Sequence, residues 1–498
     1  MNQNKTLKLF AIIIGFLLLS PILYMIIESL KTEQGFSFYL YSKLLDIEIW
    51  HSFRESLYLA FLVAISTTII GISLAILLGK TTLRFTNFFL LIFIIPLLIP
   101  PYILAYSWFE LIGRDELLFS FWGVAFILFW VYLPIPILLG KLFLEQIEPK
   151  LEESALLFSN WWRVLRYITL PLIAPAIVFS FLLVFILAFG EFSVANFFRY
   201  PIFPMESFTQ FSAFYDFKMA TVTAMPMVVI ALVILIIESL FFSKNAFRFK
   251  SETKIKKIEL GRAKTPILLS IFVLILFIIL PLSTLIVKTD IDSFLIAIEK
   301  GYEPLIRSLI YASIGATVLT ILGFLGAYMI GKFWRGFESI LLFSFIIPSS
   351  VIGIGLILFW NRPYTNFVYT TPLIIILGYF AKYLFLTTKI IEVKLSQIPK
   401  SLIESAQLTG ASWWRVVWSI ILPLSRKSLI IAWIIGFIFS LRETTITMLV
   451  YPAGSDTLPL YIFTQMANGE PEIIASLSLV MVGVVLIFLG GYFLIHTY

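Results

Sequence analysis

The sequence has no cysteine and only two histidines, His51 and His496, among its 498 residues. A chain without cysteine forms no disulfide, no thiolate metal site and no cysteine nucleophile. Two histidines so far apart in the sequence cannot make a metal cluster by themselves. The residue types that carry much of catalytic and metal-binding chemistry are therefore almost absent.

Charged residues are scarce as well, at 13% of the chain, whereas 60% of the residues are hydrophobic and the mean hydropathy is +1.00. Soluble domains have roughly 25% charged and about 45–50% apolar residues. An apolar excess of this size cannot be wrapped in polar surface, so the chain needs lipid as its outer solvent. The composition indicates an integral membrane protein, and membrane lipid is its first expected partner.

Twelve apolar runs are long enough to cross a bilayer as helices, for which about 20 residues are needed. The first six cover residues 9–28, 56–79, 87–108, 121–143, 171–190 and 219–242. The second six cover residues 266–287, 308–331, 338–360, 371–390, 423–441 and 473–495. The first run is too long for the core of a signal peptide, so we expect an uncleaved helix there. The predicted fold class is all-α, with about twelve transmembrane helices.

The net charge of +7 is concentrated in a few short loops, which is the positive-inside pattern of membrane proteins and argues against a nucleic-acid partner. The richest segment, residues 244–265, carries eight Lys and Arg residues against Glu252 and Glu259. A cytoplasmic N-terminus places this segment inside the cell. Twelve spans then place the C-terminus in the cytoplasm as well.

The two halves of the chain repeat at a constant offset of 252 positions. The recurring residues are Gly79-Lys80 with Gly331-Lys332, Ile95-Pro96 with Ile347-Pro348, and Glu191 with Glu443. Parallel repeats of six helices are a known plan of membrane transporters. We predict two tandem parallel six-helix units, residues 1–243 and 266–498, joined by a basic cytoplasmic linker at 244–265.

An amphipathic segment lies between apolar runs once in each half, at residues 145–170 and 396–422. In the second copy a short helix should be followed by a turn at Gly410, because glycine takes a positive φ at little steric cost. A second helix is expected from Ser412 to about Ile421. Leu422-Pro423 should end that helix and start the next span.

The first copy is one residue shorter, and Ser159-Asn160 takes the place of the glycine turn. Asparagine tolerates the left-handed backbone region better than most residues, so a tighter turn is expected there. Each copy is thus predicted to form two short helices on the membrane face.

The pattern Glu-x-Ala, three residues, Gly, nine residues, Ile-x-Leu-Pro resembles the EAA loop of type I binding-protein-dependent ABC importer permeases. In the second copy the matching residues are Glu404, Ala406, Gly410, Leu422 and Pro423, with Trp414 and Arg415 between them. In the first copy they are Glu153, Ala155, Leu170 and Pro171, with Ser159, Asn160, Trp162 and Arg163 between them. Two copies in register with the repeat extend the resemblance over essentially the whole chain.

The resemblance implies that these residues couple the chain to an ATP-binding subunit, present as a homodimer, that docks on both loops from the cytoplasm. It also implies a periplasmic or lipid-anchored protein that binds the substrate, and a location in the bacterial cytoplasmic (inner) membrane. Because the first copy departs from the pattern, we expect the two couplings to be unequal.

ATP hydrolysis is not expected in this chain. The stretch Gly79–Thr82 reads GKTT, but a phosphate-binding loop needs a glycine where Leu74 stands. The HExxH motif of zinc proteases is absent from the sequence as well. We therefore expect a transport subunit with no catalytic residue, no metal ligand and no cofactor.

Glu191 and Glu443 occupy equal positions at the outer ends of the fifth and eleventh spans. A carboxylate deep in lipid costs about 2.5–3.5 kcal/mol even on the lenient insertion scale, so both should face water or a protein cavity. They are either caps near the membrane surface or a paired acidic lining of the translocation path.

The substrate is best approached through two stretches, residues 187–226 and 441–480, which resemble fused ferric iron permeases. The resemblance implies ferric iron as cargo, with selection residing in the separate binding protein. Fused thiamine permeases and phosphonate or other oxyanion systems are the alternatives within the family. Twelve spans in two parallel halves also describe proton-coupled secondary transporters.

Overall fold

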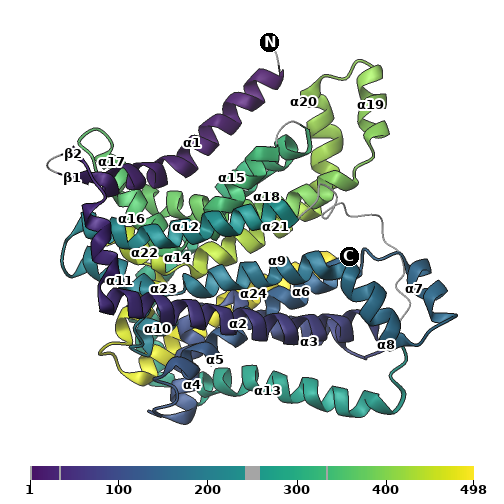
Figure 1. Cartoon of the computed structure of the whole chain (residues 1–498), viewed down its shortest axis with the longest axis horizontal. Helices are drawn as coiled ribbons and strands as arrows, with labels where there is room; N and C mark the ends of the chain where they lie inside the picture. The colour runs from purple at the N-terminus through teal and green to yellow at the C-terminus, as the bar shows by residue number, and fades with distance from the viewer. Residues whose placement is uncertain (1–2, 33–34, 242–257, 333–334, 498) are drawn as a thin grey trace.

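The computed structural model describes residues 3–32, 35–241, 258–332 and 335–497, and these are almost entirely helical (Figure 1). A short antiparallel pair of strands, β1 (Lys31–Thr32) and β2 (Gly35–Phe36), follows the first helix. Helices of the first half are α1 (Gln3–Leu30), η1 (Tyr39–Leu45), α2 (Ile47–Lys80), α3 (Thr86–Leu98), α4 (Pro101–Ile112), α5 (Phe121–Tyr132), α6 (Pro134–Leu144), α9 (Leu170–Phe189), α10 (Ser193–Phe197), α11 (Phe203–Ser212) and α12 (Phe217–Phe241). Those of the second half are η3 (Gly261–Ala263), α13 (Lys264–Lys288), α14 (Ile291–Lys332), α15 (Arg335–Ile346), α16 (Ser349–Trp360), α17 (Asn366–Tyr369), α18 (Leu373–Gln397), α21 (Leu422–Arg442), α22 (Thr445–Val450), α23 (Leu458–Gln465) and α24 (Pro471–Thr497).

The expectation of about twelve transmembrane helices is confirmed. Among the described residues, ten helices are long and apolar enough to cross a membrane, and α5 with α6 counts as one of them. Two further pairs, α3 with α4 and α15 with α16, reach the required length only together. The pairs bend by 101° and 102°, so the predicted spans at 87–108 and 338–360 are each broken in the middle.

Proline causes both breaks. Pro100 and Pro348 stand at the starts of α4 and α16, where a residue without an N–H is tolerated. The residue before proline is pushed into extended backbone, and Ile99 has φ −94° and ψ 156°. Pro96 instead lies inside α3. The sequence pairing of Pro96 with Pro348 is therefore wrong in three dimensions, because a longer connection between α2 and α3 than between α14 and α15 moves the equivalent break to Pro100.

A buried lysine satisfies the backbone at the second break. Lys382 on α18 donates from Nζ to the carbonyl oxygens of Phe345 at 2.9 Å and Ile347 at 2.6 Å. These carbonyls lie beside the break at Pro348, where no helical N–H can reach them. The first half has Trp130 at the repeat position, and its indole N–H has no hydrogen-bond partner among the described residues. The two breaks are thus stabilised differently.

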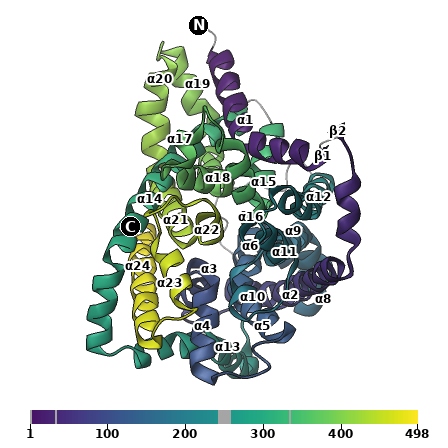
Figure 2. The same cartoon turned by 90° about the vertical axis from the view of Figure 1, so that its left-hand side faces the viewer.

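The first helix of each half packs against the other half (Figure 2). Helix α1 lies along α15 and α16, and α13 lies along α3 and α4. Gly355 on α16 permits this approach, since a Cβ there would lie 3.3 Å from the Pro21 carbonyl oxygen of α1. The halves therefore interlock around a shared hydrophobic core.

The unit boundaries at 1–243 and 266–498 stay predictions. Residues 244–257 of the basic linker lie outside the described residues. Its end is described: Ile258 pairs with the segment after α2 through a 2.8 Å bond to the Lys80 carbonyl and a 3.0 Å bond from the Thr82 N–H. The last residues of the linker thus lie against the first half.

Replacing Lys382 should destabilise the break at Pro348. We expect Lys382→Met to lower the stability of the purified protein by at least about 1.5–3 kcal/mol, the value of one hydrogen bond from a charged group. Trp130→Phe is the matched control, because it removes an N–H that has no partner, and it should cost less. Equal thermal unfolding of Lys382→Met and the parent would contradict the bracing role.

Candidate coupling loops and transmembrane cavity

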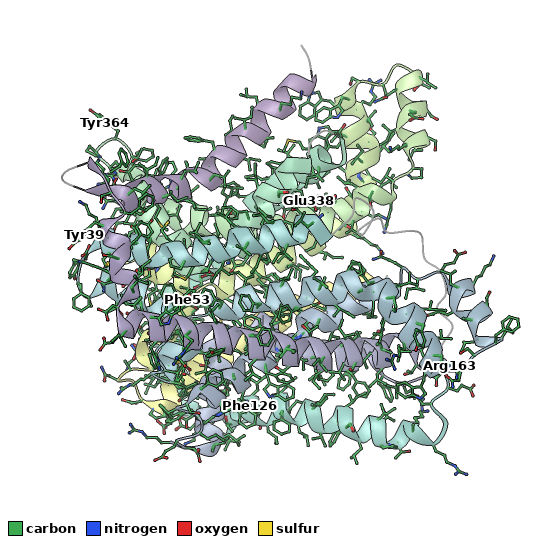
Figure 3. All side chains as sticks on the ribbon, viewed as in Figure 1. Tyr39, Phe53, Phe126, Arg163, Glu338 and Tyr364 are labelled. Atoms are coloured by element: carbon green, nitrogen blue, oxygen red, sulfur yellow. The ribbon has the colours of Figure 1, made fainter. Side chains whose placement is uncertain are left out.

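Both amphipathic segments project from the same end of the molecule, opposite β1, β2 and α17 (Figure 1). The first contains α7 (Pro149–Leu156) and α8 (Trp161–Val164), and the second contains α19 (Lys400–Leu408) and α20 (Trp413–Val416). In Figure 3 the side chain of Arg163 on α8 lies at this end, whereas Tyr39 and Tyr364 lie at the other. The two short helices expected in each segment are present.

The turns between these helices differ. Gly410 has φ +80°, in the left-handed region as expected. The expectation of a left-handed turn at Asn160 is wrong, because its φ is −86°. Its side chain instead accepts a hydrogen bond from the N–H of Arg163 at 3.0 Å and so caps α8. Ser412 occupies the same capping position in the second loop, with a longer contact of 3.4 Å to the N–H of Arg415.

Leu422-Pro423 does not end the second helix of its loop, contrary to the sequence interpretation. The helix runs on without a break from Trp413 to Arg442, and the first loop behaves alike from Trp161 to Phe189. Each passage contains a π-helical turn, Leu165–Thr169 (η2) and Val417–Ile421 (η4), at equal positions of the repeat. A π turn inserts an extra residue into the helix, which lets the chain pass the proline without a break.

The first loop is held to the membrane helices by a buried ion pair. Lys80 at the end of α2 donates to Glu152 Oε2 at 2.5 Å, and their exposed fractions are 1% and 5%. The hydroxyl of Thr169, in the π turn, donates to the other carboxylate oxygen at 2.7 Å. Glu152 thus joins α7, α2 and the start of α9. The sequence analysis singled out its neighbour Glu153, which is half-buried.

The second loop is anchored in another way. Glu404 lies 252 positions after Glu152 but is exposed. The indole N–H of Trp413 donates to the hydroxyl of Tyr328 on α14 at 2.8 Å instead. The offset of 252 and the recurring Gly-Lys pair were the sequence signals that could have identified Glu152 and Lys80.

The remaining predicted loop residues differ in their solvent exposure. The exposed ones are Asn160, Trp162, Arg163, Pro171, Gly410, Trp414, Arg415 and Pro423, and the partly buried ones are Ala155, Ser159, Leu170, Ala406 and Leu422. Apolar side chains occupy both tips, with Phe158 90% and Leu408 89% exposed. Exposed large apolar side chains on each tip, beside exposed Trp and Arg, are suited to insertion into a protein groove.

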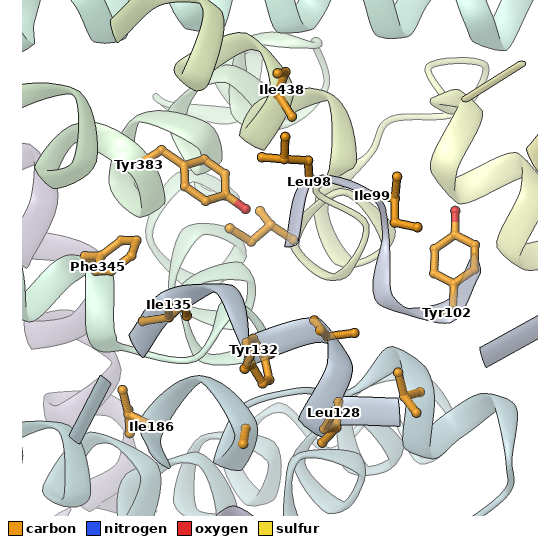
Figure 4. Close-up of a cluster of buried hydrophobic side chains, with 14 of the residues drawn as sticks. Leu98, Ile99, Tyr102, Leu128, Tyr132, Ile135, Ile186, Phe345, Tyr383 and Ile438 are labelled. Atoms are coloured by element: carbon orange, nitrogen blue, oxygen red, sulfur yellow. The ribbon is translucent and has the colours of Figure 1, made fainter. Parts of the chain in front are cut away.

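A cavity of about 270 Å³ lies between the two halves, at the far ends of α9 and α21 from the loops. Glu191 and Glu443 both line it, so the structure brings together the two carboxylates that the repeat pairs. Figure 4 shows Tyr132 and Ile135 of the first half across from Phe345 and Tyr383 of the second, and all four line the cavity.

Both carboxylates are buried and cap short helices while lining the cavity, so the two readings of the sequence are compatible. Glu191 accepts hydrogen bonds from the N–H groups of Ser193 at 2.9 Å and Val194 at 3.0 Å, at the start of α10. Glu443 accepts one from the N–H of Ile446 at 2.9 Å in α22 and another from the Tyr383 hydroxyl. Such bonds stabilise a carboxylate away from bulk water.

Two cationic residues of the cavity were missed by the sequence analysis, Lys382 and Arg442. Both belong to the second half. The residue at the repeat position of Arg442 is Gly190, where a Cβ would come within 2.8 Å of Pro348. Among the described residues that line the cavity, those of the first half include no basic side chain. Gly190 lets the end of α9 meet the break before α16.

The sequence matches the family described as binding-protein-dependent transport system inner membrane component twice, at residues 68–243 and 319–496. These matches cover more than half of the chain. The chain belongs to this family. It is a multi-pass inner-membrane permease with two copies of the family's domain.

Similar proteins include ferric transporters. The permease is 24% identical to the ferric transport system permease protein FbpB of Actinobacillus pleuropneumoniae, over 87% of the chain and 70% of that protein. It is 24% identical to the Fe(3+)-transport system permease protein FbpB 2 of Haemophilus influenzae, over 96% of the chain and 95% of the relative. The putrescine transport system permease protein PotI of Escherichia coli is 28% identical over 36% of the chain and 67% of its own length.

Glu152 should matter more for stability than its repeat counterpart. We expect Glu152→Gln to lower the stability of the permease by about 3–5 kcal/mol, because it leaves the Lys80 ammonium buried without its charged partner. Glu404→Gln, on an exposed side chain, should change thermal unfolding little. The double variant Glu152→Gln with Lys80→Met should recover part of the loss. Equal unfolding of the two single variants would contradict this assignment.

Proposed function

We propose that this permease forms the translocation path of an ATP-driven importer, with ATP hydrolysis in a separate subunit that docks on its two loops. The observation that carries the proposal is mechanical: each loop runs without a break into a membrane helix whose far end lines the cavity. Force applied to α8 or α20 would thus reach the end of α9, beside Glu191, or Arg442 through a continuous helix. A secondary transporter has no evident need for two such levers.

The docking surface consists of the coupling residues of both loops and their apolar tips. In this proposal Glu153, Ala155 and Ser159–Arg163 contact one copy of a homodimeric ATP-binding subunit, and Glu404–Arg415 contacts the other. Leu-Pro at 170–171 and 422–423 transmits the motion. The buried Glu152–Lys80 pair makes the first lever stiffer at its base than the second.

The orientation follows from the positive-inside rule. The loop end of the molecule faces the cytoplasm, together with both termini and the basic linker. The opposite end, with β1, β2 and α17, faces the periplasm and receives a substrate-binding protein. Helix α1 begins and α24 ends toward the loop end in Figure 1, as this orientation requires.

Ferric iron is the proposed cargo. Relatives named as ferric transport permeases match most of the chain, whereas the putrescine permease matches about a third of it. In this proposal iron selection belongs to the binding protein, and the permease supplies a gated passage. ATP binding would draw the two loops together and rock the halves, switching access to the cavity.

Uptake should depend on the apolar tips of the loops. We expect Phe158→Asp and Leu408→Asp to reduce ATP-dependent uptake of radioactive ferric iron by cells at least tenfold, because each places a charge in an apolar contact. Tyr364→Asp, a similarly exposed aromatic residue at the opposite end, is the control for membrane insertion and expression. Vanadate should block uptake in the parent.

Three results would contradict the proposal. They are uptake that resists vanadate, uptake that continues unchanged in both tip variants, and uptake that collapses with a proton ionophore while ATP is maintained. The last of these would favour a proton-coupled transporter.

A further inference from the structure

The cavity between the halves is lined by a positively charged side chain, Arg442, with an unused hydrogen-bond donor. Arg442 ends α21 and lines the cavity, and its Nη1 atom is buried without a hydrogen-bond partner among the described residues. None of the described carboxylates forms an ion pair with it. A guanidinium within a membrane protein is costly unless an anion or a water-filled space accompanies it, so the position itself calls for a negatively charged neighbour.

The carboxylates of the cavity are already engaged elsewhere. Each oxygen of Glu191 accepts at least one bond from Ser193 or Val194. The two oxygens of Glu443 accept from Ile446 and Tyr383. The two carboxylates therefore accept hydrogen bonds from the first residues of α10 and α22 and from the Tyr383 hydroxyl. The guanidinium of Arg442 remains as a hydrogen-bond donor for a ligand.

We propose that the cavity binds a small oxyanion through Arg442, either free or as an oxygen ligand of the ferric ion. The inference rests on the proposed function, because it names the class of substrate that passes between the halves. A planar guanidinium matches a carboxylate or phosphate with two parallel hydrogen bonds. Ferric iron favours hard oxygen donors of the same two chemical classes.

The shape of the cavity suits such a ligand. Its volume of about 270 Å³ is just below the ~300–1,000 Å³ of pockets for drug-sized molecules. Lys382 adds a second positive charge to the lining. A polyamine would face two cations here, while the carboxylates of Glu191 and Glu443 already accept hydrogen bonds from the protein, so the lining disfavours the cargo named for the putrescine relative.

The test uses the full-length permease in lipid nanodiscs, without nucleotide or an ATP-binding subunit. Thermal unfolding is followed while inorganic phosphate, citrate, ferric citrate or putrescine is titrated at constant ionic strength. We expect a saturable rise in Tm with an oxyanion and none with putrescine. Stabilisation by phosphate or citrate alone identifies a free oxyanion, and stabilisation by ferric citrate alone identifies the iron-bound form.

Variants of Arg442 decide whether the effect arises at this residue. Arg442→Gln should weaken the apparent affinity at least about tenfold, since one charged hydrogen bond corresponds to that factor or more. Arg442→Lys should retain part of the binding, and Arg426→Gln, exposed on the same helix, should leave it unchanged. If Arg442→Gln does not fold, the inference is still tested by the parent protein, whose Tm should rise with an oxyanion and not with putrescine.

Three outcomes would overturn the inference: no stabilisation by any oxyanion, equal stabilisation of the parent and Arg442→Gln, or stabilisation by putrescine. None of them depends on ATP. If nanodisc binding fails while vanadate-sensitive uptake persists, only the oxyanion site is wrong. If the site binds but uptake ignores vanadate, only the proposed ATP coupling is wrong.

Discussion

Inside a bilayer every backbone N–H and C=O group must find its partner within the protein, and much of this structure follows from that requirement. Long helices meet it for most of the chain. Where Pro348 breaks the pattern, the Lys382 ammonium supplies the missing donors to two carbonyls. Where α9 and α21 end, Glu191 and Glu443 supply acceptors to the next short helices. The irregular backbone is therefore gathered around the cavity, where protein rather than lipid surrounds it.

The two repeated halves share the same arrangement of helices but differ in the charged side chains that they place at corresponding positions. Both keep the bent helix pair, the π turn and the capping glutamate at corresponding places. The second half provides Lys382 and Arg442 to the cavity, whereas the first half buries the Glu152–Lys80 ion pair beneath its loop. Since both copies reside in one polypeptide, each can diverge without disturbing a symmetric partner. The cavity is consequently polarised, with its positive charge on one wall.

Sequence reasoning found the features that depend on local pattern and missed those that depend on packing. The lengths of the apolar runs predicted the number of spans. The sequence around Gly410 predicted a left-handed turn that the structure contains. The buried ion pair of Glu152 was missed because the Glu-x-Ala pattern points to its neighbour Glu153. The passage of the helix through Leu422-Pro423 was missed because a π turn has no compositional signature. The crossing of α1 to the other half depends on contacts some 330 residues apart, which no local pattern encodes.

The two membrane helices that continue the loops, α9 and α21, end at different parts of the cavity. The proposed mechanism therefore gives the two halves different roles. Helix α9 spans roughly 30 Å at 1.5 Å per residue. Gly190, at its end, packs against Pro348, where the helix pair α15–α16 of the other half is broken. Helix α21 delivers Arg442 into the cavity itself. A tilt of α9 would therefore press on the α15–α16 bend that Lys382 braces, whereas a tilt of α21 would move the guanidinium. In the proposed mechanism, simultaneous movement of both loops would thus change the shape of the passage through α9 and the position of its positive charge through α21.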